Sequence, residues 1–402
     1  MAFNSTLWSQ LPLEVVEQVL SFLPVPDLCR YCTTCKTWNE LINNPAFGML
    51  HVRNRNKHSP FIAIHSIATS IYDEYIDASQ VLCFLDISSK KWYSMKPRDA
   101  LETSFVFNHR YIKVVAMDGG LVLLEAREGA PKLCHHESGC TQLFVWNPIK
   151  DIKINLPCVP YFYSYYSLIN FVVDDIAETF KVFVMNQDWK NRFVSIYDFR
   201  MKEWKASSKV EMNNIRINQS IVFQNNLYIL CFVFARNHDM DEHYELWRYN
   251  DVADIWERLH FTEGCFAEPS YENFGWDEQL IVSGGRLFVT FLCVSQNDLF
   301  EVHEIDIQSR STKVLLAWSR MQIIRNFDRD VIRYNYLKIH VIGFNKSIML
   351  MCNISRNIVI FDVETKETNL EWPQLPLRKL RREEKYSLMG KQMDFLLLGT
   401  LK

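Results

Sequence analysis

The sequence predicts a small all-helical module at the N-terminus, followed by a large all-β ring built from repeated units. The chain has 402 residues, which is more than one ordinary core of ~250–300 residues organises. Its first fifty residues carry a helical apolar pattern interrupted by prolines. The remainder alternates short β-branched and aromatic runs with turn residues, and one such unit repeats at steps of 51 to 61 residues.

Composition narrows the classes of function. Lys and Arg number 44 against 47 Asp and Glu, a formal net charge of −3. A general nucleic-acid binder needs a basic excess, so this balance argues against direct nucleic-acid binding. The hydrophobic fraction of 48% excludes a disordered chain. The longest apolar stretch, Tyr228–Ala235, is far shorter than the ~20 residues of a membrane-spanning helix, so we expect no membrane contact.

The N-terminal apolar run and the cysteines bear on location. The run Leu7–Leu23 contains Glu14 and Glu17 and has no basic leader, so we expect an amphipathic helix rather than a signal peptide. The 11 cysteines are odd in number and scattered. This usage predicts reduced thiols, and therefore a protein of the cytoplasm or nucleus.

Three short helices are predicted between residues 7 and 50. Pro12 opens a segment whose apolar side chains recur on one helical face, and Pro24 ends it. Pro26 suits the first turn of a second helix. A third apolar cluster surrounds Trp38, and the Asn43–Pro45 run breaks it. Three such helices cannot bury a self-sufficient core. Their apolar surface must either pack on the rest of this chain or dock on a partner protein.

These fifty residues resemble an F-box. The family pattern is a Leu-Pro pair, a helix that ends in Leu-Pro, and a later helix with Cys-Lys-x-Trp. This chain carries the pattern at Leu11-Pro12-x-Glu14, Leu20, Leu23-Pro24, Leu28, Arg30, Cys35-Lys36-x-Trp38, Leu41 and Phe47. Thr34 departs from the family, which usually has an aliphatic residue there. The Cys29, Cys32 and Cys35 series is a second departure, and both would slightly loosen the small core.

The resemblance implies a partner. F-boxes bind a Skp-type adaptor, which links them to a cullin ubiquitin ligase. By resemblance, the residues that make or support this interface are Leu11, Pro12, Leu20, Leu23, Pro24, Leu28, Cys35 and Trp38. An apolar helical stripe suits such docking; the alternative is a helical cap packed on its own domain. We place the F-box at residues 1–50, a polar and basic linker at 51–60, and the β ring at 61–402.

A landmark recurs through the β region. Six short strands end in Asp or Asn, each with a large apolar residue just before: Asp86, Asn147, Asp198, Asn250, Asp306 and Asp362. In three of them a Trp follows six residues later: Trp92, Trp204 and Trp256. An Asx side chain caps a tight turn, and a Trp is large enough to fill the wedge between neighbouring sheets. Four strands in about 50 residues make one blade of a β-propeller, so we predict six blades.

The repeat resembles the kelch type, which has a glycine doublet before one strand of each blade. Here the turn doublets are Gly119-Gly120, Asn225-Asn226 and Gly284-Gly285, with Asp174-Asp175 and Gly343-Phe344 at the corresponding places of blades 3 and 6. The Trp146-Asn147-Pro148 run is more similar to the F-box-associated repeats of plant proteins. Together the two halves resemble a plant-type F-box/kelch-repeat protein, with a kelch-like propeller of six blades.

Ring closure is a further expectation. We expect a final strand at Asp394–Gly399 to pair with the first blade, because closure removes exposed sheet edges. The alternative architecture is a pair of two-sheet β-sandwiches.

No catalytic centre is predicted. The Cys134–Cys140 segment has soft ligands close together, but structural zinc usually draws on two separated pairs, so we interpret it as a loop. Cys29, Cys32 and Cys35 fit small core residues better than metal ligands. The chain has no nucleophile elbow, P-loop or dinucleotide fingerprint. We expect no cofactor and no metal, although a propeller enzyme stays open because a fold alone does not settle function.

Kelch-type propellers bind partners through the loops between blades and in the middle of each blade. By that resemblance, the candidate substrate-binding residues are Tyr161, Phe162, Tyr163, Tyr165, Tyr166, Arg325 and Arg329. The alternatives are rings that point into a strand and arginines on a solvated loop. The expected function is the substrate-recognition subunit of an SCF-type cullin ubiquitin ligase, without catalytic groups of its own. The alternative is an F-box/propeller scaffold or transcriptional co-regulator that acts without ubiquitylation.

Overall fold

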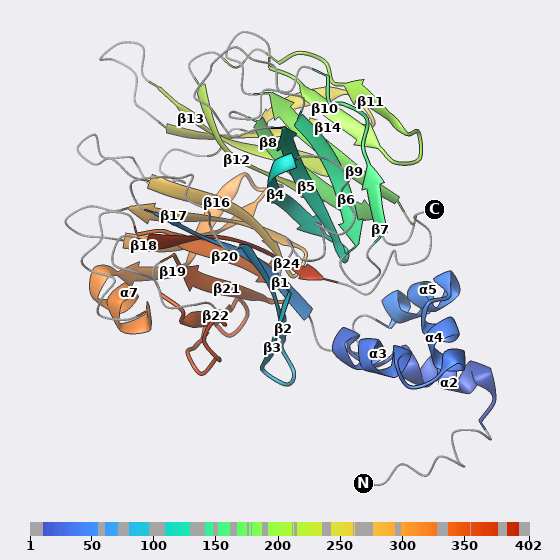
Figure 1. The fold of residues 1–402 in the computed structure, drawn as a ribbon. Coiled ribbons are helices and arrows are strands. Elements are labelled where there is room, and N and C mark those ends of the chain that lie inside the picture. The colour runs from blue at the N-terminus through green and yellow to red at the C-terminus, as the bar shows by residue number, and fades with distance from the viewer. Residues whose placement is uncertain are drawn as a thin grey trace.

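The computed structural model has a helical bundle beside a ring of six four-stranded sheets (Figure 1), which confirms the predicted fold class. It describes residues 11–54, 61–70, 80–95, 109–128, 141–147, 152–160, 167–174, 177, 179–186, 192–210, 212, 215–234, 243–259, 261, 276–293, 299–327, 337–353, 355–376 and 384–393. No helix in these ranges is long and apolar enough to span a membrane.

The bundle contains four helices in its described part: α2 (Leu13–Leu20), α3 (Val25–Cys32), α4 (Lys36–Ile42) and α5 (Pro45–Arg53). Pro12 and Pro24 occupy the N-cap positions of α2 and α3. The fourth helix, α5, was not predicted. Pro45 does end α4, but it also opens α5, because proline lacks only a donor that the first turn does not use. The Asn44 Oδ1 atom accepts a hydrogen bond from the Ala46 N–H at 3.0 Å and caps the new turn.

Buried hydrogen bonds hold α5 to the start of the bundle. The His51 Nε2 atom lies 3.1 Å from the carbonyl oxygen of Leu23. The Asn54 side-chain amide donates to the Ser21 Oγ atom at 2.7 Å, and both residues are buried. The bundle therefore reaches Asn54, inside the segment that we expected to act as the linker.

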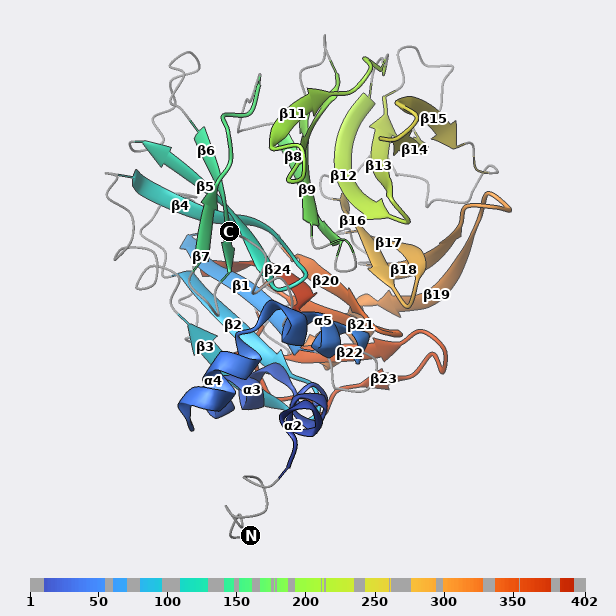
Figure 2. The ribbon, with the colours of Figure 1, turned by 90° about the vertical axis from the view of Figure 1, so that its right-hand side faces the viewer.

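Six antiparallel blades form the ring, and each runs from an innermost strand to an outermost one. They are numbered along the chain: blade 1 is β24-β1-β2-β3, and blades 2 to 6 are β4–β7, β8–β11, β12–β15, β16–β19 and β20–β23. Innermost strands contact each other in the order β24, β4, β8, β12, β16, β20 and back to β24, so the ring is closed (Figure 2). The strands are β1 (Phe61–Ser70), β2 (Gln80–Asp86), β3 (Lys91–Met95), β4 (His109–Asp118), β5 (Leu121–Glu128), β6 (Thr141–Asn147), β7 (Ile152–Asn155), β8 (Ser167–Asp174), β9 (Thr179–Asn186), β10 (Val194–Asp198), β11 (Glu203–Ala206), β12 (Ile215–Phe223), β13 (Asn226–Val233), β14 (His243–Asn250), β15 (Ile255–Leu259), β16 (Trp276–Ser283), β17 (Arg286–Cys293), β18 (Leu299–Asp306), β19 (Ser311–Ser319), β20 (Ile339–Phe344), β21 (Ser347–Cys352), β22 (Ile358–Asp362), β23 (Thr368–Asn369) and β24 (Glu384–Met393).

The closing strand lies earlier in the chain than predicted. It is β24, Glu384–Met393, which pairs with β1 from Phe61↔Met393 to Ser70↔Glu384. The predicted segment, Asp394–Gly399, falls outside the described residues. The first blade is therefore built from both ends of the β region, and this pairing leaves the first strand without a free edge.

The six landmark residues end the third strand of each blade, as predicted. In five of the turns that follow, the landmark Oδ1 atom accepts a backbone N–H from two residues later at 2.9–3.1 Å. The residue four positions after the landmark then has a positive φ of 52–60°: Lys90, Lys202, Asp254, Arg310 and Lys366. We call the end of the ring with these turns the turn face, and the opposite end the open face.

The landmark tryptophans join neighbouring blades, as predicted. The indole N–H of Trp92 donates to the carbonyl of Pro373 at 3.2 Å. Trp204 donates to Pro157 at 2.9 Å and Trp256 to Ser208 at 3.1 Å. Each acceptor lies just after the last strand of the preceding blade. The Trp side chain thus fills the wedge with its ring and satisfies its donor across the joint.

The turn doublets differ in two blades from the predicted positions. In blade 4 the positive-φ pair is Gln224-Asn225, one residue earlier than expected. In blade 6 the turn follows Phe344, with Asn345 at φ 44°, and Gly343 lies inside β20. A Cβ atom on Gly343 would lie 2.0 Å from the carbonyl oxygen of Val282 in β16 of the preceding blade. Gly343 is therefore needed where β20 and β16 approach each other closely, and it does not form a turn.

Acid should destabilise the ring through His340 in β20. Burial, together with the charge of Lys338, lowers the pKa of His340 from 6.5 to about 3. Below about pH 6.5, His340 therefore binds a proton in the unfolded chain but stays neutral in the folded chain. The free energy of unfolding consequently falls as pH drops from 6.5 towards 3. We predict that the free energy of unfolding falls by about 2 kcal/mol more between pH 7.5 and 5 in the wild type than in His340→Gln.

Urea unfolding at the two pH values measures this difference. An identical pH dependence in wild type and His340→Gln would contradict the prediction.

Candidate protein-docking site

Helix α2 has apolar side chains on two faces, and only one face is covered by this chain. Val16 and Leu20 are 3% and 1% exposed and belong to the bundle core. Four other large apolar residues on or beside the helix remain 39–50% exposed: Leu11, Leu13, Val15 and Val19. We call these four residues the α2 strip. Val15 and Val19 are spaced i, i+4, which places them on one side of the helix. Leu11 precedes the N-cap residue Pro12.

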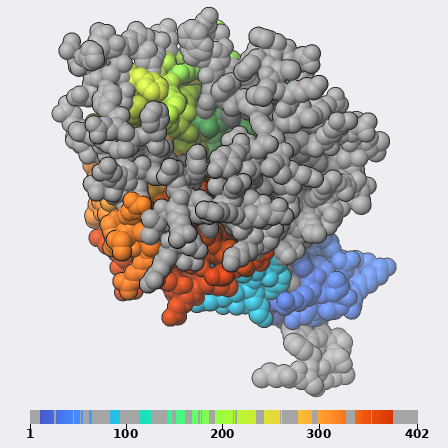
Figure 3. Space-filling model, turned by 60° about the vertical axis from the view of Figure 1, so that its left-hand side comes forward, coloured from blue at the N-terminus to red at the C-terminus, as the bar shows by residue number. Residues whose placement is uncertain are grey.

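The helix that carries the strip lies away from the ring. In two perpendicular views α2 lies on the side of the bundle remote from the blades (Figures 1 and 2). The space-filling view shows the bundle standing out from the body of the molecule beside the first blade (Figure 3). An apolar surface in this position is accessible to another polypeptide.

The sequence-predicted interface residues separate into three groups. Leu11, Pro12 and Cys35 are exposed, whereas Leu23, Pro24 and Trp38 are half-buried. Leu20 and Leu28 are 1% and 0% exposed. These two leucines cannot touch a partner while the bundle is folded, so their part is to support the surface from beneath. The predicted interface set left out Val15 and Val19, although both are among the apolar residues of this segment.

Local contacts fix the junction between α3 and α4. The Cys35 Sγ atom accepts the Trp38 N–H at 3.4 Å and caps α4. The Trp38 ring meets the Tyr31 ring edge-on, with centroids 5.1 Å apart. Burial, followed by the neighbouring Cys32, raises the pKa of Cys29 to about 11, which keeps this thiol protonated and suits a core role.

The described part of the chain holds no cluster of three or more His, Cys, Asp or Glu side chains arranged for a metal ion. The Cys134–Cys140 segment lies outside the described residues.

The bundle is attached at the turn face of the ring. Strand β1 begins there, because Phe61 pairs with the landmark residue Asp86. The Arg30 guanidinium donates to the Tyr93 hydroxyl at 3.3 Å and lies 6.0 Å from its ring centroid. Met49 of α5 packs against the apolar cluster between blades 2 and 3. These contacts place the bundle beside blades 1 to 3 and leave the open face uncovered by it.

Of the predicted substrate-binding residues, only Arg325 lies within the described residues. Tyr161, Phe162, Tyr163, Tyr165, Tyr166 and Arg329 lie outside the described residues, and their role stays a prediction. Arg325 is exposed on α7 (Arg320–Phe327), a helix that follows β19 at the open face. Ser355 and Asn357 donate to the carbonyl of Phe327 at 2.6 and 3.1 Å and hold the end of α7 to blade 6.

Comparison with known proteins identifies the helical part. Residues 8–47 match the F-box-like family model. The putative F-box only protein 15 of Arabidopsis thaliana is 25% identical over 209 residues, which cover 51% of this chain and 49% of the relative. An F-box/kelch-repeat protein of the same plant is 25% identical over 254 residues, or 62% of this chain and 60% of the relative. The chain spans about half the length of the curated relatives it matches.

Fold and comparisons together define the class of protein. The chain has an F-box-like domain at its N-terminus and a six-bladed β-propeller behind it. It resembles Arabidopsis F-box proteins, among them F-box/kelch-repeat proteins, which confirms the resemblance seen in the sequence. A chain of the nidogen–laminin complex covers 81% of this chain at 8% identity and a TM-score of 0.44, a likeness too low to carry an argument.

The two faces of α2 should differ sharply in their contribution to stability. Leu20→Ala removes a buried side chain and leaves a cavity, so we predict a loss of about 2–5 kcal/mol in the free energy of unfolding of the bundle. Val19→Ala changes an exposed side chain and should stay within about 0.5 kcal/mol of the wild type. Urea unfolding followed by helical circular dichroism measures both. Equal losses for the two variants would show that Val19 is not on an exposed face.

Proposed function

We propose that this protein is the substrate-recognition subunit of an SCF-type cullin ubiquitin ligase. The observation that carries the proposal is the α2 strip, a set of exposed apolar side chains on the F-box-like domain and remote from the ring. The strip would dock on a Skp-type adaptor, and through it on a cullin. Burial of apolar surface against a partner removes it from water, which is the main favourable term in association.

The propeller would hold the target protein. The bundle sits at the turn face, so the open face is available for a target while the α2 strip is engaged elsewhere. Ubiquitin transfer would take place on other subunits, and this chain would contribute proximity and orientation rather than catalytic groups. The site of action would be the cytoplasm or nucleus, because the 11 cysteines are odd in number and scattered along the chain.

The test is co-purification of the full chain with a Skp-type adaptor. Replacing Val15 and Val19 together by Asp puts two charges into the proposed interface, and we predict at least a hundredfold loss of adaptor affinity. The fold should survive, because both side chains are exposed. Leu20→Asp is unsuitable for this test, because it would bury a charge in the bundle core.

A matched control is available on the ring. Val252→Asp introduces the same substitution at a valine that is 86% exposed in a turn of blade 4, and it should bind the adaptor as the wild type does. Wild-type binding by the Val15→Asp/Val19→Asp variant would refute the proposed docking surface.

A further inference from the structure

A transverse row of side chains crosses blade 4 near the open face. Arg216 of β12 pairs directly with Phe232 of β13, and Phe232 pairs with Tyr244 of β14. The Phe232 and Tyr244 ring centroids are 5.2 Å apart. Phe234, which follows β13, meets Phe232 edge-on at 5.2 Å and remains 42% exposed. We call Arg216, Phe232, Phe234 and Tyr244 the aromatic–arginine row.

Blade 5 anchors the outer end of this row, at Tyr244. The Tyr244 ring lies 5.3 Å from the ring of Phe291 in β17, and both residues are buried. The Tyr244 hydroxyl donates a hydrogen bond to the buried carboxylate of Glu278 in β16. The row is therefore clamped between two blades, and its exposed members rest on a rigid base. Preorganised side chains of this kind bind partners with little loss of conformational entropy.

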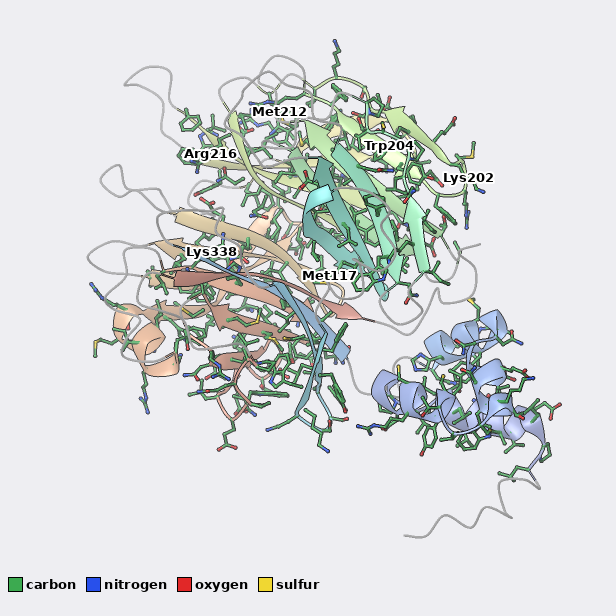
Figure 4. The ribbon with its side chains drawn as sticks, viewed as in Figure 1. Met117, Lys202, Trp204, Met212, Arg216 and Lys338 are labelled. Carbon is green, nitrogen blue, oxygen red and sulfur yellow. The ribbon has the colours of Figure 1, made fainter. Side chains whose placement is uncertain are left out.

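Arg216 is exposed but held in position. Its guanidinium lies 5.8 Å from the centroid of the Phe232 ring, and its Nε atom donates to the Asn218 Oδ1 atom at 2.9 Å. A guanidinium held over a ring by a cation–π contact keeps N–H groups available for a carboxylate, because the contact uses none of them as a hydrogen-bond donor. Arg216 lies near the start of β12, at the end opposite the turn that follows Phe223. In Figure 4 it lies on the far side of the ring from Lys202, which belongs to the turn face.

Among the described residues of blades 4 and 5, three acidic side chains are already engaged. Glu245 pairs with the guanidinium of Arg258 and lies 3.2 Å from His243. The carboxylate of Glu301 lies 2.9 Å from the His303 ring, and Glu278 accepts from Tyr244. The side chains of Glu245 and Glu301 are only 7% and 18% exposed. The surface of this part of the open face therefore offers an exposed cation beside an exposed aromatic ring.

We propose that the aromatic–arginine row recognises a peptide segment of a target protein in which an acidic residue lies close to a large apolar one. Arg216 forms a bidentate pair with the carboxylate, and Phe234 covers the apolar side chain. Arginine and aromatic side chains together are the usual composition of an interface hot spot. The identification of this peptide as part of a substrate rests on the proposed function. The binding chemistry of the row does not depend on that function.

The experiment is a selection of random short peptides displayed on phage against the immobilised full chain. We expect enrichment of Asp or Glu near a Leu, Phe or Trp. Labelled synthetic copies of the enriched peptides should bind Arg216→Glu at least about tenfold more weakly than the wild type, as loss of a charged hydrogen-bonded pair predicts. Selection against Arg216→Glu should enrich Lys or Arg instead, and Phe234→Ala should lose the apolar preference.

Lys202→Glu is the matched control, because it makes the same reversal of charge at the turn face. It should leave the selected peptides and their affinities unchanged. The inference is overturned if no acidic peptides are enriched, or if Arg216→Glu binds the enriched peptides as tightly as the wild type. Adaptor binding measured on the same preparations separates the two ideas. Retained adaptor binding without peptide selection counts against this inference alone, and the converse counts against the proposed function alone.

Discussion

The structure depends on a helix that has more apolar surface than its own chain covers. Helix α2 fixes the bundle through Val16 and Leu20, which pack with the buried side chains of the later helices. Its remaining apolar side chains stay in contact with water. Pro12 and Pro24 fix the residues at which α2 and α3 begin. They therefore also fix which residues of α2 face the bundle core and which face water. The proposed docking partner would cover this exposed apolar surface.

The ring supplies a rigid body on which the bundle is mounted. Pairing of β24 with β1 closes the circle, and the landmark tryptophans connect adjacent blades through backbone carbonyls. Because β1 starts at the turn face, the chain topology places the bundle at one end of the ring and leaves the other end free. A docking surface on α2 and a recognition surface on the open face can then be occupied at the same time.

Much of this architecture was readable from the sequence, because it rests on local chemistry. The landmark residues end their strands since Asp and Asn cap the turns themselves, and each Trp lies opposite the residue before its landmark: Leu85↔Trp92, Tyr197↔Trp204 and Tyr249↔Trp256. The closing strand was placed too late because Glu384–Met393 contains no β-branched residue and becomes a strand only by pairing with β1. Helix α5 was missed because a proline that ends one helix can also begin the next.

The candidate site was less predictable, because exposure depends on which helix face the tertiary packing covers. Leu20 and Val19 are adjacent apolar residues, yet one is 1% and the other 39% exposed. Sequence resemblance selected Leu20 and Leu28, which are buried, and overlooked Val15 and Val19. The aromatic–arginine row was invisible for a similar reason, since its members come from strands that only the blade geometry aligns.

Hydrogen–deuterium exchange of the full chain, alone and mixed with a Skp-type adaptor, shows whether the α2 strip is the docking surface. We predict that the adaptor slows exchange chiefly in residues 11–20, where the α2 strip lies, and leaves the strands at the open face unchanged. Unchanged exchange in residues 11–20, together with slowed exchange elsewhere in the chain, would contradict it.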